Sequence, residues 1–387
     1  MREIICIQIG QCGNQIGTKF WEEIGDEHII DVKGNPVASK VEDIWQRKER
    51  INVYYDESKS HKFVPRSILA DLDPVSIDSI KAGKLGKLFK AENMLNAGGS
   101  TGNNCAKGLY TDGVELSNQV LELTRKEAEI CDSLQGIQVI HSIGGGTGSG
   151  MGALVISKLM EERIARVTTS FTHTPHPKVS DIVVEPYNAI LSLHSLIENI
   201  DHTYLFDNNA LNNICDQFLK LENPTYELTN NIITRVMTGV TAGLRFHGQN
   251  NQDFIKLGTS LKPYPHLSFF LTGLSSFTIP NSMVNPIVSM SELANGMLNP
   301  QHYLATCNPM VKSKNISLVN IVRGRIAVQE MEELVATVKS DNRKQFIKSS
   351  SIHSVVCGVT AKNRIICYLY YQYNSNKKPF ERDFISV

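Results

Sequence analysis

The chain has 387 residues, which is long enough for two domains with a substantial hydrophobic core in each. Hydrophobic residues make up 41% of it and charged residues 20%, a globular composition without an apolar run long enough to cross a membrane. The 39 basic and 39 acidic residues cancel, which argues against nucleic acid as the main partner.

The first predicted element is a strand that runs into a glycine loop. Glu3–Gln8 is strand-like, Gly10–Gly17 carries several glycines, and Phe20 and Trp21 follow at helical spacing. Met1 opens directly onto this strand, so we expect no signal peptide. A strand, a glycine loop and a helix in this order are typical of the α/β sheets that bind nucleotides.

A second glycine loop, Ala97–Asn104, precedes a helix-like segment from Leu116 to Ala128. Several strand-to-helix loops that meet at the carboxyl edge of one parallel sheet are how open α/β sheets bind nucleotides. The spread of the glycines over several loops differs from a Rossmann enzyme, which concentrates them in its first loop.

The third glycine loop, His141–Gly150, is the most informative segment of the chain. It lies between a strand-like run, Ile137–Ile140, and a helix-like run that begins at Met151. Its closely spaced glycines let the backbone approach a ligand, and their N–H groups form a nest for negative charge. We therefore predict a phosphate site, with a flexible linker or turn as the alternative for an isolated glycine cluster.

The same loop leaves a second class of function open. Gly148-x-Gly150-x-x-Ala153 satisfies the relaxed Rossmann pattern, so a dinucleotide enzyme stays in view at this point. No Gly-x-x-x-x-Gly-Lys-Ser/Thr run is present, which excludes a standard P-loop. No catalytic acid, base or hydride-transfer motif accompanies the glycine loops, so the enzyme is the weaker alternative.

The second half predicts a long helix followed by a mixed sheet. After Pro224, the apolar stripe of Ile232, Ile233, Val236, Met237 and Val240 indicates a buried helix face. A capping box at Ser289–Glu292 and an apolar spacing over Met331–Val338 indicate two further helices. The predicted strands are Leu267–Leu271, Val319–Val322, Val355–Cys357 and Ile365–Tyr370. The eight cysteines show no CxxC pair and are expected to be reduced, mostly buried thiols.

Several motifs, in order along almost the whole chain, resemble the tubulin family and most closely its β-type members. They are Met1–Ile4, Gly10–Gln15, Gly144–Gly150, Lys178–Asp181, Val184–Asn188 and Arg323–Arg325. The resemblance implies an α/β fold with a doubly wound GTP-binding domain over 1–208, linking and central helices over 209–247, and a second α/β domain with a mixed sheet over 248–387. It also implies that the C-terminal helical hairpin of the family is largely absent from this sequence.

The resemblance assigns GTP or GDP and Mg²⁺ to the glycine loops and to residues around them. For the phosphates it implies Gln11, Cys12, Ser142, Gly146, Thr147 and Gly148, and toward the γ-phosphate Gly99, Ser100, Thr101, Gly102 and Asn103. For the ribose it implies Asp181 and Glu185, for guanine Asn208 and Asn230, and for stacking Tyr226. Asp73 stands where the family has its acidic Mg²⁺ residue, usually Glu, and its shorter side chain would act through a water.

Lys256 predicts how the bound GTP would be hydrolysed. At this position α-tubulin has a glutamate that polarises water on the neighbouring subunit's GTP, whereas β-type members have lysine. A lysine ammonium has no acceptor and cannot act as that base. The resemblance therefore implies GTPase activity only in trans with an α-type tubulin, as a heterodimer and in the polymer, in the cytoplasm and its cytoskeleton.

Two departures leave an alternative open. Within the segment Phe277–Asn285, Pro280 and Asn285 replace the Arg and Tyr of the family's lateral-contact loop, and such residues are typical interface anchors. The sequence also ends at Asp383–Val387 without the acidic tail, so we do not expect binding of motors and associated proteins. The alternative is a degenerate tubulin that binds nucleotide without polymerising and has a regulatory role or none.

Overall fold

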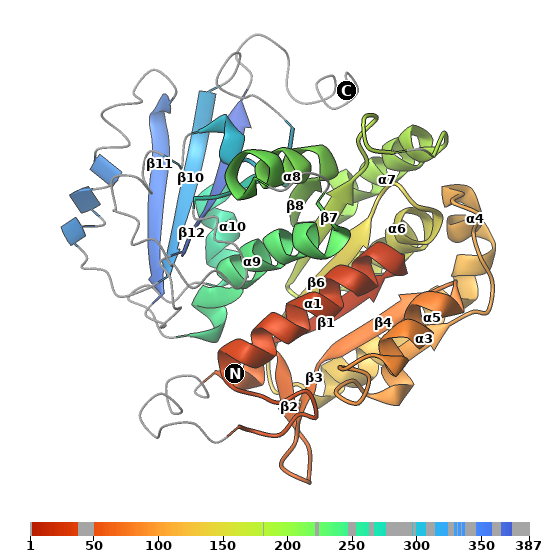
Figure 1. Cartoon of the computed structure of the whole chain (residues 1–387). Helices are drawn as coiled ribbons and strands as arrows, with labels where there is room; N and C mark the ends of the chain where they lie inside the picture. Colours follow the sequence, from red (N-terminus) through yellow and green to blue (C-terminus); the bar gives the residue numbers. More distant parts are fainter. Residues whose placement is uncertain are drawn as a thin grey trace. The chain divides into compact units, whose positions relative to one another are not determined.

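The computed structural model describes residues 2–37, 50–180, 182–220, 224–246, 253–262, 267–275, 296, 299–306, 314–323, 329–330, 332–333, 335–336, 346–357 and 365–373. Two compact units divide the chain. The first comprises Met1–Tyr204 with Asn230–Thr238, and the second Leu205–Thr229 with Gly239–Val387. Figure 1 labels most of the helices and strands and colours the chain by residue number.

The first unit is built on a parallel sheet with β1 at its centre. Its strands, in spatial order, are β7 (Val167–Thr174), β6 (Leu134–Ser142), β1 (Glu3–Ile9), β4 (Ser67–Asp71) and β5 (Met94–Asn96). All four pairings are parallel. Every residue of β1 is buried, because helices cover both faces of such a sheet, and the strand is apolar apart from Glu3 and Gln8.

Helices follow the strands in alternation, as the sequence predicts. They are α1 (Gly10–His28), α3 (Pro74–Ala82), α4 (Cys105–Tyr110), α5 (Asp112–Ile130), α6 (Gly152–Glu162) and α7 (Glu185–Asn199). A small antiparallel hairpin, β2 (Tyr55–Glu57) with β3 (Phe63–Pro65), lies between α1 and β4 in the chain. One difference concerns the second glycine loop, which leads first into the short helix α4 and only then into the predicted helix α5.

An aromatic cluster packs α1 against the segment that leads into β2. Trp21 lies with its ring centroid 5.8 Å from those of Phe20 and Tyr54 and 5.4 Å from that of Tyr55, each in an edge-to-face arrangement. All four side chains have no exposed surface. Aromatic pairs of this kind add about 0.5–1.5 kcal/mol each beyond the area that they bury. The cluster therefore fixes α1, which includes the whole of Gly10–Gly17; the first predicted glycine loop is thus the start of a helix that follows β1 directly.

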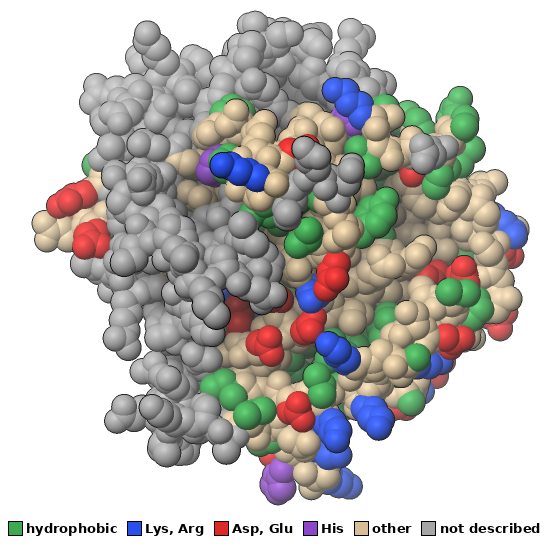
Figure 2. All heavy atoms as spheres, viewed as in Figure 1, with side chains coloured by type: hydrophobic (Ala, Val, Ile, Leu, Met, Phe, Trp, Pro, Cys, Tyr) green, Lys and Arg blue, Asp and Glu red, His purple; other side chains and the backbone are tan. Residues whose placement is uncertain are grey.

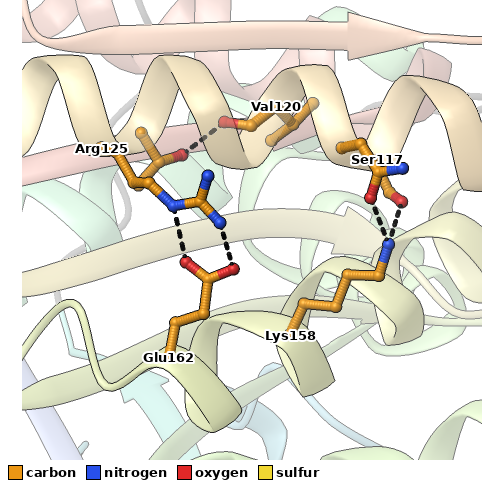
Figure 3. A network of polar contacts seen from close by, with 7 residues as sticks. Ser117, Val120, Arg125, Lys158 and Glu162 are labelled. Carbon is orange, nitrogen blue, oxygen red and sulfur yellow. Dashed lines mark hydrogen bonds and ion pairs between the residues drawn. The ribbon is translucent and has the colours of Figure 1, made fainter.

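Polar contacts join α5 to α6 on the outside of the first unit (Figure 3). The Arg125 guanidinium donates to both carboxylate oxygens of Glu162, at 2.9 and 2.5 Å. Lys158 reaches across in the opposite direction and donates to Ser117 and Asn118, at 3.0 and 2.6 Å. These contacts hold the helix that continues directly from the third glycine loop.

The second unit contains the predicted mixed sheet. Its strands, in spatial order, are β11 (Phe346–Cys357), β10 (Lys314–Arg323), β12 (Ile365–Tyr373) and β9 (Phe269–Leu274). β10 pairs in parallel with β11 and antiparallel with β12, which pairs antiparallel with β9. Its helices include α8 (Asn208–Ile214) and α10 (Phe254–Leu261). β8 (His202–Asp207) and the central helix α9 (Tyr226–Arg245) contain residues of both units.

The α/β fold class is confirmed, while some local predictions fall outside the described residues. These are the capping box at Ser289–Glu292, the segment Phe277–Asn285, and parts of Met331–Val338 and of Arg323–Arg325. No helix in the described ranges is long and apolar enough to span a bilayer. On the face drawn in Figure 2, acidic and basic side chains are interspersed, in keeping with the net charge of zero.

Candidate functional site: the glycine loops of the first unit

The carboxyl edge of the parallel sheet gathers the predicted phosphate loops. β1 leads into α1, β5 into the loop 97–104, and β6 into the third glycine loop. Because β1, β5 and β6 belong to one parallel sheet, their carboxyl ends meet at the same edge. Segments that lie up to 140 residues apart in the sequence thus contribute to one region of the first unit.

Two glycines allow the first and third loops to touch. Gly10 has a φ of +76°, and a Cβ atom there would lie 3.1 Å from the Gly148 nitrogen. A Cβ atom on Gly148 would lie 2.5 Å from the Ser142 carbonyl oxygen, closer than any side chain allows. Glycine is therefore required at both positions by backbone conformation and by close approach, and not by flexibility.

The helices after these two loops begin without a side-chain cap. α1 starts at Gly10 and the π-helical turn Thr147–Met151 starts the α6 segment, and no side chain accepts from their first N–H groups. By contrast, Asp73 caps α3 and Asn104 caps α4. Uncapped N–H groups at a helix start, together with the helix dipole, favour an anion. Gln11, Cys12, Thr147 and Gly148 all lie in these two uncapped first turns.

The loop 97–104 presents a mostly exposed backbone in left-handed conformations. Gly98, Gly102 and Asn103 have φ values of +66°, +56° and +60°. Gly99 and Ser100 are exposed as well, and the Lys107 ammonium donates to the Ser100 carbonyl oxygen at 2.9 Å. Thr101 is buried, and a Cβ atom at Gly146 would overlap it, so this residue packs the second loop against the third.

Two aspartates lie at the carboxyl end of β4, where Asp71 is the last residue of the strand and Asp73 follows it. Asp71 is buried, accepts from the Ser76 hydroxyl and from the Asp73 N–H, and burial raises the pKa of its carboxyl. Asp73 is partly exposed and accepts from the Val75 N–H at 3.0 Å through one oxygen. Among the described residues, no other group bonds to the Asp73 carboxylate.

This arrangement suits Mg²⁺ held mainly by phosphate and water. The described residues contain no group of three His, Cys, Asp or Glu side chains that could form an all-protein metal site. Mg²⁺ commonly uses one or two carboxylates together with waters and substrate phosphates. The donor chemistry of Asp73 therefore fits the ion that the sequence implies.

Two titratable side chains at this edge are held uncharged by burial. Burial lowers the pKa of the His141 imidazole to about 4 and raises the pKa of the Cys12 thiol to about 12. Because a carbonyl only accepts, the contact of 2.9 Å between His141 Nδ1 and the Gly148 oxygen requires the proton on Nδ1. Nε2 then accepts from the Ser170 hydroxyl at 3.1 Å. Neutral His141 therefore stabilises the third loop through its bond to the Gly148 carbonyl. Cys12 is a protonated thiol at neutral pH and does not act as a thiolate nucleophile.

Helix α7 brings a carboxylate and a buried amide to the same loops. Glu185 is its first residue, and its carboxyl carbon would lie 3.4 Å from a Cβ atom on Gly144. Asn188, one turn later, is buried and bonds to the backbone of Asn103, Cys105 and Gly144. The sequence reasoning gave no role to Asn188, although it stands in the motif Val184–Asn188. Asp181 lies outside the described residues.

The residues predicted to bind the guanine base, and Lys256, lie on other helices. Asn208 begins α8, and Tyr226 and Asn230 lie one helical turn apart at the start of α9, where Tyr226 is 71% exposed. Asn208 and Tyr226 belong to the second unit and Asn230 to the first. Lys256 is exposed on α10. The roles of these four residues stay predictions.

Comparison with known proteins supports a nucleotide-binding role for the glycine loops. Residues 3–216 match the Tubulin/FtsZ family, GTPase domain, and residues 265–364 match the Tubulin C-terminal domain. The chain is similar to the Tubulin beta-6 chain of Gallus gallus, with 46% identity over 361 residues, which cover 93% of this chain and 80% of that protein. The GTPase domain of this family implies binding of GTP or GDP. The chain therefore belongs to the tubulin family and is β-tubulin-like.

Proposed function

We propose that this chain is a structural subunit of microtubules that holds GTP or GDP with Mg²⁺ and pairs with an α-type tubulin. One observation carries the proposal: the uncapped, glycine-rich starts of α1 and of the α6 segment touch at Gly10 and Gly148. Two helix starts whose N–H groups converge from neighbouring loops suit a chain of phosphates. The similarity to a named β-tubulin chain supports the cytoskeletal part of the proposal.

Guanine recognition is assigned to Asn208 and Asn230, with Tyr226 stacking on the base. An asparagine amide can accept from N1–H or N2–H₂ of guanine while it donates to O6, and adenine reverses that pattern. We expect the protein to prefer GTP over ATP strongly, measured as dissociation constants in the presence of Mg²⁺. Asn208→Asp should erode the preference because a carboxylate has no donor for O6. Equal affinities of the unmodified protein for GTP and ATP would contradict this assignment.

Bound Mg²⁺ would neutralise phosphate charge, with Asp73 as its acidic residue on the protein. Asp73→Asn should weaken Mg²⁺-dependent GTP binding. The amide oxygen of the asparagine can still accept from the Val75 N–H, so α3 keeps its cap. Titration of nucleotide affinity against Mg²⁺ concentration measures the effect. An unchanged Mg²⁺ dependence would remove Asp73 from the metal site.

Hydrolysis is proposed to need a partner. Because Lys256 offers no acceptor, the isolated chain should release phosphate from GTP only at a trace rate. An α-type tubulin that supplies a glutamate in trans should raise the rate. Lys256→Glu should allow hydrolysis between like subunits if the chain self-associates end to end. Stoichiometric phosphate release by the isolated wild-type protein would contradict this arrangement.

The replacement of interface anchors by Pro280 and Asn285 favours the second candidate function, a tubulin that binds nucleotide without polymerising. Co-sedimentation separates the two candidates. The protein is mixed with α-type tubulin and GTP, and its share in the polymer pellet is compared with that in the supernatant. Incorporation in proportion to the α-type partner supports the microtubule subunit, and exclusion from polymer with intact GTP binding supports the alternative.

A further inference from the structure

The side chain of Asn188 joins three segments of the first unit. Its Oδ1 accepts from the Cys105 N–H at 3.0 Å, and its Nδ2 donates to the carbonyl oxygens of Asn103 at 2.7 Å and Gly144 at 2.9 Å. Since one partner is a donor and two are acceptors, only this orientation of the amide satisfies all of them. Asn188 is 3% exposed, so water does not replace these bonds.

Each partner of Asn188 belongs to a different part of the candidate site. Asn103 lies in the loop proposed to face the γ-phosphate and has a φ of +60°, a left-handed conformation that asparagine adopts more readily than most residues. Cys105 begins α4, and Gly144 lies in the third glycine loop. Asn188 itself lies one helical turn after Glu185, the proposed ribose-side carboxylate, at the start of α7.

We infer that Asn188 is a positioning residue that holds the loop 97–104 in its nucleotide-competent conformation and couples that loop to α7. The inference rests on the proposed function, because it takes the loop 97–104 to be the γ-phosphate loop. A shift of Asn103 on loss of the γ-phosphate has to break or move the Nδ2 bond. The start of α7 then senses which nucleotide is bound. Asn188 touches backbone only and has no chemical role of its own.

The affinity ratio of GTP to GDP isolates this role. The bond from Asn188 to Gly144 supports the third glycine loop, which is proposed to contact both GTP and GDP, so loss of this bond cancels in the ratio. The bonds from Asn188 to Asn103 and Cys105 support contacts that only GTP makes. Asn188→Ala and Asn188→Asp in the full-length chain should each lower the ratio at least about fivefold, the effect of one hydrogen bond. An unchanged ratio in a wild-type-like fold would overturn the inference.

Asn93 offers a matched control. It is another buried asparagine of the first unit, whose Nδ2 donates to the Ser67 carbonyl oxygen at 3.0 Å and to Glu127 at 2.9 Å, away from the glycine loops. Asn93→Ala should lower the melting temperature as much as Asn188→Ala and leave the GTP-to-GDP ratio unchanged. A ratio that falls equally in both variants would mean that stability alone, and not positioning, sets it.

A pH profile separates positioning from packing. In Asn188→Asp, an ionised carboxylate would face two carbonyl oxygens, and burial would raise its pKa, so protonation should restore one donor as the pH falls. The GTP-to-GDP affinity ratio of Asn188→Asp should recover toward the wild-type value as the pH falls from about 8 to about 6. Asn188→Ala should stay flat over the same range, and a flat profile in both would count against the amide donor.

Hydrogen exchange of the wild-type protein tests the coupling even if the variants do not fold. GTP, and not GDP, should slow exchange of the Cys105 N–H and of the first turn of α7 together. Protection of the loop alone would overturn the coupling. If the wild-type chain binds neither nucleotide, the proposed function fails. If it binds both and the Asn188 variants keep the wild-type ratio, only this inference fails.

Discussion

The two edges of the parallel sheet in the first unit treat their polar groups in opposite ways. At the amino edge, Glu3 accepts from Arg66 at 3.2 Å and from the Ser133 N–H at 2.8 Å, and Asp201 accepts from the Thr168 N–H at 2.9 Å. At the carboxyl edge, the first turns of α1 and of the α6 segment have no side-chain cap. The Glu3 and Asp201 carboxylates at the amino edge are bonded within the protein, whereas the two helix starts at the carboxyl edge keep N–H donors for a ligand.

The amino edge should therefore yield the largest loss of stability without loss of binding. Arg66→Ala leaves the Glu3 carboxylate buried, with both side chains of the pair 4% exposed, and should cost about 4 kcal/mol of unfolding free energy. Urea denaturation measures the loss, and nucleotide affinity of the folded protein should not change. Lys19→Ala, which removes a partly exposed pair with Glu22, is the control and should cost less than about 0.5 kcal/mol.

The carboxyl edge should show the reverse. Gly148→Ala places a Cβ atom against the Ser142 carbonyl and displaces the third loop, so GTP affinity should fall about 100-fold, equivalent to about 3 kcal/mol. Isothermal titration calorimetry measures it. Gly25→Ala, on α1, is the control. Its Cβ atom would lie 3.5 Å from the nearest atom, which is an ordinary van der Waals contact, so the affinity for GTP should not change. If both glycine variants bind normally, the third loop is not the phosphate site.

The pH dependence of stability should reveal the histidine beneath the third loop. Burial lowers the pKa of folded His141 to about 4, from 6.5. As the pH falls below 6.5, the unfolded chain binds a proton that the folded chain does not, so stability decreases until about pH 4. At pH 5 the loss should be about 2 kcal/mol relative to pH 7.

Replacement of this histidine tests the assignment. His141→Asn keeps a donor near the position of Nδ1 and should remove that part of the pH slope, measured by urea denaturation at several pH values. His61→Gln, at an exposed position, is the control and should leave the slope intact. An unaltered slope in His141→Asn would assign the dependence to another group.

The smallest effect is expected at the outer contact between α5 and α6. Arg125→Ala removes an exposed ion pair, so the melting temperature should change by no more than about 1 °C. Hydrogen bonding to Glu162 raises the pKa of Arg125, and the same bond lowers the pKa of Glu162. The small contribution should therefore be fully present above the unfolded pKa of Glu162 and be lost as the pH falls through its lower folded pKa, and high salt should weaken it. A large destabilisation would show that this contact does more than join two surfaces.

The sequence predicted the parallel-sheet frame well because its signals are local. A buried strand, a glycine loop and an apolar helix stripe are each readable within about 20 residues, as for β1 with α1 and for β6 with α6. The short helix α4 was missed because six residues carry little periodicity. The π-helical turn Thr147–Met151 was missed because its extra residue per turn breaks the helical spacing.

The support of the candidate site could not be predicted in the same way. The partners of Asn188 lie 44, 83 and 85 residues away in the sequence, so only the assembled sheet brings them within hydrogen-bond distance. The proton position on His141 likewise follows from the Gly148 carbonyl that faces it. Glycines reveal where backbone segments must come close to one another, as at Gly10 and Gly148, whereas the side chains that hold the backbone there depend on tertiary contacts.

The buried thiol of Cys6 gives the first unit a built-in probe of opening. Alkylating and oxidising reagents attack thiolates, and burial raises the pKa of the Cys12 thiol to about 12, that of Cys131 to about 11, and that of Cys6 as well. At neutral pH these thiols are almost entirely protonated, and Cys6 is also fully buried, whereas Cys12 and Cys131 are partly exposed. The labelling rate of Cys6 with a maleimide or iodoacetamide would therefore report how often the unit opens, and a bound ligand that closes the unit would slow this reaction.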